Sequence, residues 1–154
     1  MKKKGLIFAV ATLALLLYFR PLPFPELSFE DADNLNIHKV DLLFENGRPS
    51  MDSTTYSFAE GSPEADAIGE ILERYSYRRS LRSLIRVTDI SGNDADFWLH
   101  IWCGDFYFSS GGTGEITVND HVYRMGWFGN RKNLALMEEI AAVLAEAQPA
   151  EDPE

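Results

Sequence analysis

The hydrophobic and polar positions of the chain change their period several times, and each period predicts a different element. Val40, Leu42 and Phe44 occupy every second position, as in a β-strand with two different faces. Turn-forming residues (NGRPS) follow at 46–50, and the β-prone sequence STTYSFA comes shortly after them. We therefore expect a β-hairpin over residues 38–58.

A period of about 3.6 residues begins at Ser62 and predicts a helix. Ser62 suits the N-cap and Pro63 the first helical position. The carboxylates of Glu64 and Asp66 suit the positive end of the helix dipole. Apolar side chains recur at helical spacing, at Ala65, Ile68, Ile71, Leu72 and Tyr75. We expect this helix to end near Arg79.

Alternation with a period of two residues returns after this helix. The predicted strands are 84–87, 95–103, 105–110 and 114–118. Asn119-Asp120 then predicts a tight hairpin into one more short strand. A second helix is expected after Asn130 or Asn133, either of which suits its N-cap. The apolar stripe of this helix comprises Leu134, Met137, Ile140, Ala141 and Leu144.

The order β-β-α-β-β-β-β-β-α lacks the strict βα alternation of a parallel sheet, and it predicts an α+β fold. We expect a mostly antiparallel sheet of about five to seven strands with two helices packed on one face. This single domain should cover residues 37–147. An acidic linker with three prolines (21–36) should precede it, and an acidic, disordered tail (148–154) should follow it.

Residues 1–20 stand apart from this pattern as an N-terminal transmembrane or signal segment. Three lysines precede an apolar run of 15 residues from Gly5 to Phe19, and Arg20 follows the run. Small residues at alternate positions lie only inside the run, so a signal-peptidase site is poor. A helix of this length spans about 22 Å, somewhat less than a bilayer core. We favour an uncleaved single-pass membrane anchor and keep a cleaved signal peptide as the alternative.

The charges around the run predict its orientation. Lysines precede it and an acidic body follows it, so the N-terminus should be cytoplasmic and the C-terminal domain extracytoplasmic. The alternative is secretion after cleavage. Leu22 and Phe24 are expected in the membrane interface, and Pro21, Pro23 and Pro25 in an extended spacer. Such an organisation is typical of short anchored bacterial proteins.

The overall charge argues against one class of partner. The net charge is −10, and all 24 acidic residues lie after Arg20. Such a body would repel phosphate backbones, so we expect no binding to nucleic acid. Cys103 is the single cysteine, so the chain forms no disulfide within itself.

The sequence SSGGTGE (109–115) resembles a phosphate-binding loop, but the residues after it form a predicted strand and include no lysine. We therefore interpret its glycines as turn residues. His100 and Cys103 should face opposite sides of one strand, which rules them out as joint metal ligands. The acidic segment 89–96 lacks the spacing of a calcium loop. We predict no catalytic residue, no cofactor and no metal.

Two groups of side chains could form a ligand or partner surface. Trp98, His100 and Trp102 share one face of a strand, opposite the apolar face that should pack on the helices. On a helix, Arg74, Arg78 and Arg82 would line up at intervals of four residues and form a basic ridge. The alternative is that Arg74 forms an ion pair with Glu70, four residues before it on the same helix.

Three functional hypotheses follow from these features. The first is a non-catalytic binding module, attached to the membrane through its N-terminal segment, with its ligand on the tryptophan face. The second is an accessory subunit that docks onto a protein or an anionic polymer of the envelope through the arginine ridge. The third is a small hydrolase that uses Asp120 and His121.

Overall fold

The computed structural model gives an α+β fold with one sheet and three helices in the part of the chain that it describes. The described residues are 2–25, 27, 29, 32–45, 48–82, 94–119, 121–126 and 129–150. The helices are α1 (Lys2–Tyr18), α2 (Pro63–Glu73) and α3 (Arg131–Glu146). The strands are β1 (Leu22–Pro23), β2 (Asn34–Glu45), β3 (Arg48–Ala59), β4 (Ser76–Arg79), β5 (Phe97–Cys103), β6 (Phe106–Ser110), β7 (Glu115–Val118) and β8 (His121–Arg124).

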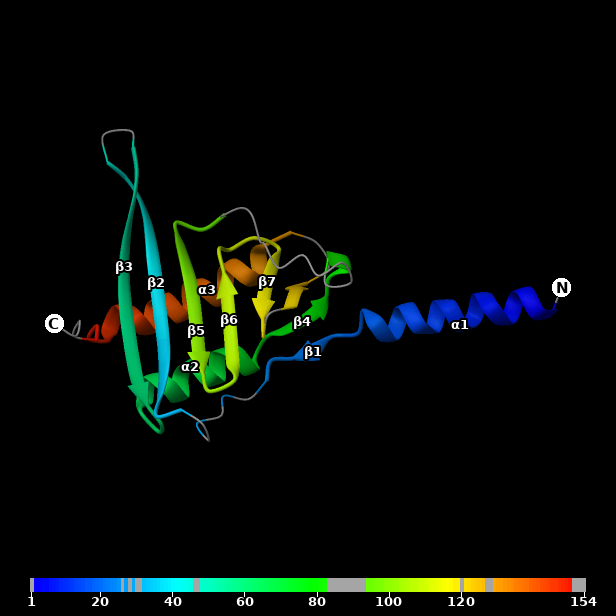
Figure 1. Ribbon diagram of the computed structural model, residues 1–154, viewed down its shortest axis with the longest axis horizontal. Helices are drawn as coiled ribbons and strands as arrows, with labels where there is room; N and C mark the ends of the chain where they lie inside the picture. Colours follow the sequence, from blue (N-terminus) through cyan, green and yellow to red (C-terminus); the bar gives the residue numbers. More distant parts are fainter. Residues whose placement is uncertain are drawn as a thin grey trace.

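The described strands form one sheet of eight in the order β1-β4-β8-β7-β6-β5-β2-β3, and every neighbouring pair is antiparallel. The predicted α+β class and antiparallel sheet are confirmed, with one strand more than the upper end of the expected range. Figure 1 shows the long β2–β3 hairpin at one edge and α1 projecting beyond the opposite edge. The predicted strand at 84–87 lies outside the described residues.

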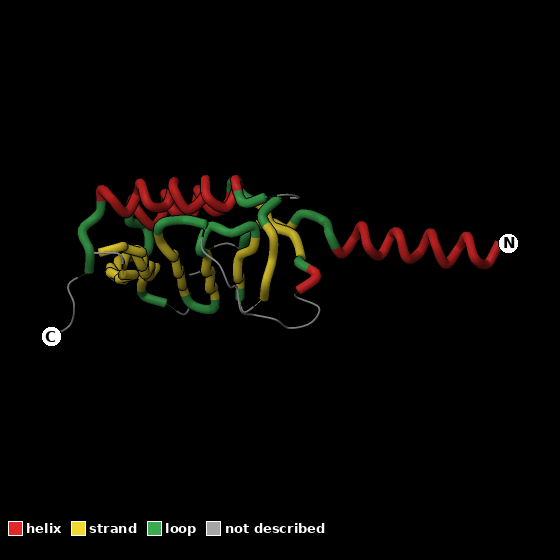
Figure 2. Tube along the Cα trace, turned by 90° about the horizontal axis from the view of Figure 1, so that it is seen from above, coloured by secondary structure: helices red, strands yellow, loops and turns green. Residues whose placement is uncertain are grey.

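Helices α2 and α3 pack on the same face of the sheet, as Figure 2 shows. The core lies between them and the sheet, because alternate strand residues point toward the helices. Its fully buried side chains include Leu35, Ile37, Leu99, Ile101 and Phe108 from strands and Ile68, Leu72, Leu136, Met137 and Ile140 from helices. The other sheet face carries no helix among the described residues.

Helix α2 begins as its sequence predicts but ends earlier. The hydroxyl of Ser62 accepts a hydrogen bond from the Ala65 amide at 3.3 Å, and Pro63 opens the helix. The helix ends at Glu73 and not near Arg79, because residues 76–79 form β4 between β1 and β8. The expected end was wrong because the helical spacing of the arginines continues past Glu73, whereas the backbone joins a sheet.

The start of the expected linker belongs structurally to the domain. Leu22 and Pro23 pair with β4, and Phe24 is 4% exposed in the core. The Phe24 ring lies 5.0 Å from that of Tyr77 and 5.9 Å from that of Phe108, centroid to centroid. Leu22 and Phe24 are therefore packed on protein and do not serve as interface anchors. The chain passes from α1 into the sheet within a few residues.

Helix α1 exposes apolar side chains along its length. Phe8 is 74% exposed, Ile7 69% and Leu6 67%. Its C-terminal end meets the domain, where the Tyr18 hydroxyl donates to the Ser80 carbonyl at 3.3 Å and Arg78 donates to the Phe19 carbonyl at 3.2 Å. None of the described helices combines the length and the apolar character that a bilayer crossing requires.

Candidate functional site

Strand β5 divides its side chains between the core and the open face of the sheet. Leu99 and Ile101 are fully buried against the helical layer. Trp98, His100 and Trp102 alternate with them and are only partly buried on the opposite face. The predicted division of this strand is confirmed, and the tryptophans are not part of the core under the helices.

Neighbouring strands add two more rings to this surface. His38 on β2 is the register partner of His100, and Tyr107 on β6 is the register partner of Trp102. The His100 ring lies 6.2 Å from His38, 6.5 Å from Trp98 and 6.4 Å from Tyr107, measured between centroids. The planes of Trp98 and His100 are inclined by only 12°. We call these five residues the aromatic face.

The aromatic face also carries polar groups. Burial lowers the pKa of His100, and the nearby His38 lowers it further. The Tyr107 hydroxyl lies 3.2 Å from Nδ1 of His100, within hydrogen-bond distance. At the side of the rings, the Ser57 hydroxyl donates to the Asn36 side-chain oxygen at 3.0 Å. Rings, an amide and hydroxyl groups therefore share one surface.

The predicted arginine ridge does not form, because its members lie on different elements. Arg74 caps the end of α2 and pairs with Glu139 of α3 at 2.6 Å, not with Glu70. Arg78 lies in β4, and Arg82 follows that strand and pairs with Glu115 at 2.8 Å. The helical alignment of these arginines was wrong because α2 ends before the second of them.

The structure brings together only part of the predicted surface. Strands β8, β7 and β6 separate β4 from β5, which places Arg78 about 19 Å across the sheet from the tryptophan strand at the usual strand spacing. Arg74 lies at the end of a helix on the other side of the sheet. The aromatic face and the three predicted arginines therefore lie in separate parts of the molecule.

Arg78 and Arg82 instead belong to a larger group of arginines where α1 meets the sheet. A cavity of about 300 Å³ is lined by Arg78, Arg79, Arg82 and Arg124 together with Phe19. Sequence reasoning did not include Arg124, which comes from β8 and is distant in the chain. Only the pairing of β4 with β8 brings it close, so no local signal indicated it.

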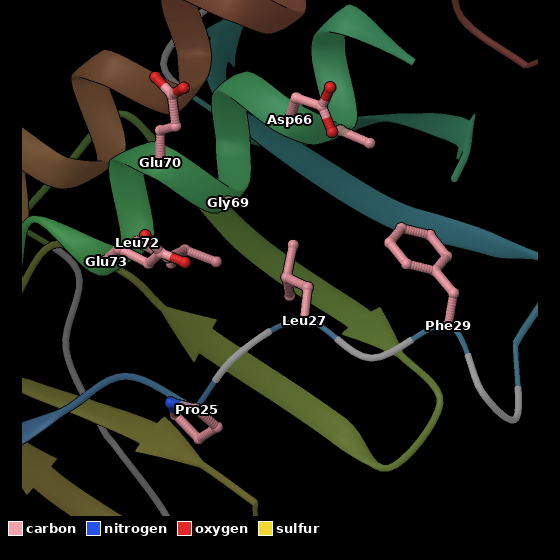
Figure 3. Close-up of a pocket in the computed structure, with 9 residues that line it drawn as sticks. Pro25, Leu27, Phe29, Asp66, Gly69, Glu70, Leu72 and Glu73 are labelled. Atoms are coloured by element: carbon pink, nitrogen blue, oxygen red, sulfur yellow. The ribbon is translucent and has the colours of Figure 1, made fainter. Parts of the chain in front are cut away.

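A separate cavity of about 370 Å³ lies beside α2, and Figure 3 shows its lining. Leu27 and Phe29 extend toward the helix from the segment after β1, and Leu27 lies within van der Waals distance of the position a Cβ at Gly69 would take. Three exposed carboxylates, those of Asp66, Glu70 and Glu73, stand at its rim. No described cation enters its lining.

The glycines of the sequence 109–115 lie in the turn between β6 and β7, as predicted. Side-chain hydrogen bonds hold this turn in place. Asn133 of α3 is fully buried, accepts a hydrogen bond from the Ser110 hydroxyl at 2.9 Å and donates to the Thr113 carbonyl. The Ser110 hydroxyl also accepts from the Gly112 amide at 3.0 Å. The loop is therefore a packed structural turn.

Among the described residues, the side chains that the sequence suggested for catalysis do not converge on a common site. Nδ1 of His121 lies 3.0 Å from the Asn119 carbonyl in its own turn, and Asp120 lies outside the described residues. Cys103 is buried in the core, and burial raises the pKa of its thiol. Within the described ranges, no three histidine, cysteine or acidic side chains converge as metal ligands would.

Comparison with known proteins gives no match to a protein family, to a characterised protein or to a solved structure.

Proposed function

We propose that this protein is a non-catalytic binding module that is held at a membrane outside the cytoplasm and takes its ligand on the aromatic face. The observation that carries the proposal is the row of rings formed by His38, Trp98, His100 and Tyr107 on the sheet face opposite α2 and α3. A contiguous aromatic patch at the surface is typical of binding sites.

The chemistry of the face favours a saccharide chain as the ligand. Sugar rings present apolar C–H faces that pack on aromatic rings, and their hydroxyl groups need hydrogen-bond partners at the sides. The rings of Trp98 and Trp102 supply the apolar surface. Asn36, Ser57 and Tyr107 supply polar groups beside it. Burial lowers the pKa of His100 and so favours its neutral form, which suits an uncharged ligand.

The exposed apolar side chains of α1 support the membrane attachment. Leu6, Phe8 and Leu13 are more than half exposed on a helix that projects away from the domain. The apolar part of α1, residues 5–18, rises about 21 Å, and a bilayer thins locally to match a short apolar segment. Contacts of Tyr18 and Phe19 with the domain favour a segment that is retained and not cleaved.

The binding test replaces each tryptophan of the aromatic face by alanine. We expect Trp98→Ala and Trp102→Ala each to lower the affinity for soluble N-acetylglucosamine oligomers roughly five- to tenfold, because a stacking ring is lost. Calorimetric titration measures the affinity, and urea unfolding measures stability. Met51→Ala is the matched control, since Met51 is 72% exposed on β3 and lies outside the face.

Two results would contradict the proposal. Unfolding of the domain by Trp98→Ala or Trp102→Ala would make these rings structural, and the site would be lost. Tight binding of neutral peptides in place of saccharides would keep the surface and overturn the ligand class.

A further inference from the structure

A strongly basic site lies at the junction of α1 with the domain, in a protein whose net charge is −10. Two cavities open there, one of about 300 Å³ and one of about 460 Å³. Among the described residues, their combined lining holds one carboxylate, that of Glu115. The arginines of the lining are Arg20, Arg78, Arg79, Arg82 and Arg124. We call these six residues and the cavities between them the junction site.

The sheet itself concentrates the positive charge. Arg78 of β4 and Arg124 of β8 are register partners, so two cations stand directly opposite each other on one face. Like charges in such a pair destabilise a sheet. Glu115 is the register partner of Arg124 on the other side, but it also pairs with Arg82 at 2.8 Å. Guanidinium groups gathered in this way are favourable hydrogen-bond donors to a phosphate.

The lining of the second cavity is both apolar and basic. Ala14 and Leu17 line it from the last turns of α1, and Leu22 lines it from β1. Arg20 and Arg79 also line it. The Arg79 guanidinium lies 5.4 Å from the centre of the Tyr18 ring, which holds it over the end of the helix. Apolar surface beside a cation is the complement of an amphiphilic anion.

We propose that the junction site binds an anionic phospholipid, with its acyl chains along Ala14 and Leu17 and its phosphate among the arginines. The inference rests on the proposed insertion of α1 in a membrane, because insertion puts Arg20 at the level of the head groups. A cavity of about 300 Å³ is within the usual range for small-molecule sites. The charge of the arginines selects an anionic lipid over a neutral one.

The test uses the full chain in a neutral detergent with short-chain lipids that dissolve singly. Native mass spectrometry measures binding of dihexanoyl phosphatidylglycerol, dihexanoyl phosphatidylcholine and glycerol 3-phosphate. We expect the anionic lipid to bind at least tenfold more tightly than either other probe. Arg79→Gln and Arg124→Gln should each weaken its binding about fivefold, since each arginine attracts an anionic lipid separately. Arg48→Gln and Arg131→Gln, at exposed positions outside the junction site, should leave it unchanged.

Each contrary result has a separate meaning. Equal binding of the two lipids, or an unchanged affinity in the Arg79→Gln Arg124→Gln double variant, would overturn the site. Equal binding of glycerol 3-phosphate and of the anionic lipid would show a site for free anions and overturn the lipid assignment. A tighter complex with an acidic peptide would overturn it in favour of a protein partner.

Flotation with vesicles of pure phosphatidylcholine tests the membrane attachment independently of the site, because these vesicles carry no net charge. Failure to float, combined with binding of the short-chain anionic lipid, would overturn the attachment and support the site. Flotation without lipid selectivity would support the attachment and overturn the site.

Discussion

At the scale of single residues, Gly112 shows why the β6–β7 turn needs glycine. Its φ of +80° lies in the left-handed region, and the turn is packed from two sides. A Cβ at this position would lie 2.7 Å from Cδ2 of Leu134 and 2.8 Å from Cβ of Ala95. The backbone conformation and the lack of space for a Cβ therefore both require glycine at this position.

Replacement of Gly112 by alanine should destabilise the domain by about 3 kcal/mol, from backbone strain and from overpacking together. Gly61→Ala is a matched control, because Gly61 has a φ of +72° but nothing within 4 Å of the added Cβ. It should cost only about 1 kcal/mol, the strain alone. Urea unfolding of both variants measures the difference, and equal losses would contradict the packing argument.

His100 should make the stability of the domain depend on pH. Its pKa in the folded protein is lowered from 6.5, so the folded state binds fewer protons than the unfolded state just below that pH. Stability should therefore be full above about pH 6.5 and fall as the pH drops toward the lowered value. Urea unfolding at several pH values gives the free energy of unfolding of the native chain and of His100→Gln. The difference between their pH dependences is the contribution of His100. An identical pH dependence in both would refute it.

At the scale of elements, the sequence predicts those whose cause is local. The cap at Ser62 and the alternation in β5 are properties of adjacent residues, and both predictions are confirmed. Strands β1 and β4 were missed because each is short and exists through its neighbours in the sheet. Residues 76–79 continue the helical spacing of the arginines, and pairing with the distant β1 and β8 turns them into a strand.

In the candidate sites too, local sequence predicts some parts and only the fold brings the others together. The face containing Trp98 and Trp102 follows from the period of one strand, and sequence reasoning identified it. The junction site requires α1, β4, β7 and β8 to meet, and no spacing in the chain encodes that meeting. Tyr107 and His38 joined the aromatic face through strand register, which is also a property of the fold and not of one segment.

Asn133 links α3 to the turn between β6 and β7, so its replacement tests how these elements hold together. Asn133→Ala removes the hydrogen bonds that this side chain forms with the Ser110 hydroxyl and with the Thr113 carbonyl. We expect a loss of about 2–3 kcal/mol, because buried hydrogen bonds are broken and the Thr113 carbonyl loses its donor. Lys132→Ala, at the exposed neighbouring position, should change stability by less than about 0.5 kcal/mol. Similar effects of the two changes in urea unfolding would contradict the role of Asn133.

At the scale of the whole molecule, charge and apolar surface are separated along the long axis. Exposed apolar side chains cover α1, the arginines of the junction site surround its C-terminal end, and the rest of the domain is acidic. An acidic body is repelled by anionic head groups, whereas the junction site is attracted to them. At a membrane, as proposed above, this arrangement would favour one orientation, with α1 toward the membrane and the β2–β3 hairpin farthest from it.

The two ends of the chain leave the sheet at opposite edges, and this has a mechanical consequence. α1 leads into β1 at one edge, and after α3 the Ala150 amide donates to the Thr55 carbonyl of β3 at the other, 2.8 Å away. A force between a fixed N-terminus and a pulled C-terminus would therefore act across the strands, along the hydrogen bonds that join them. The paired strands would separate one pair after another, so the domain would unfold under tension at a low force.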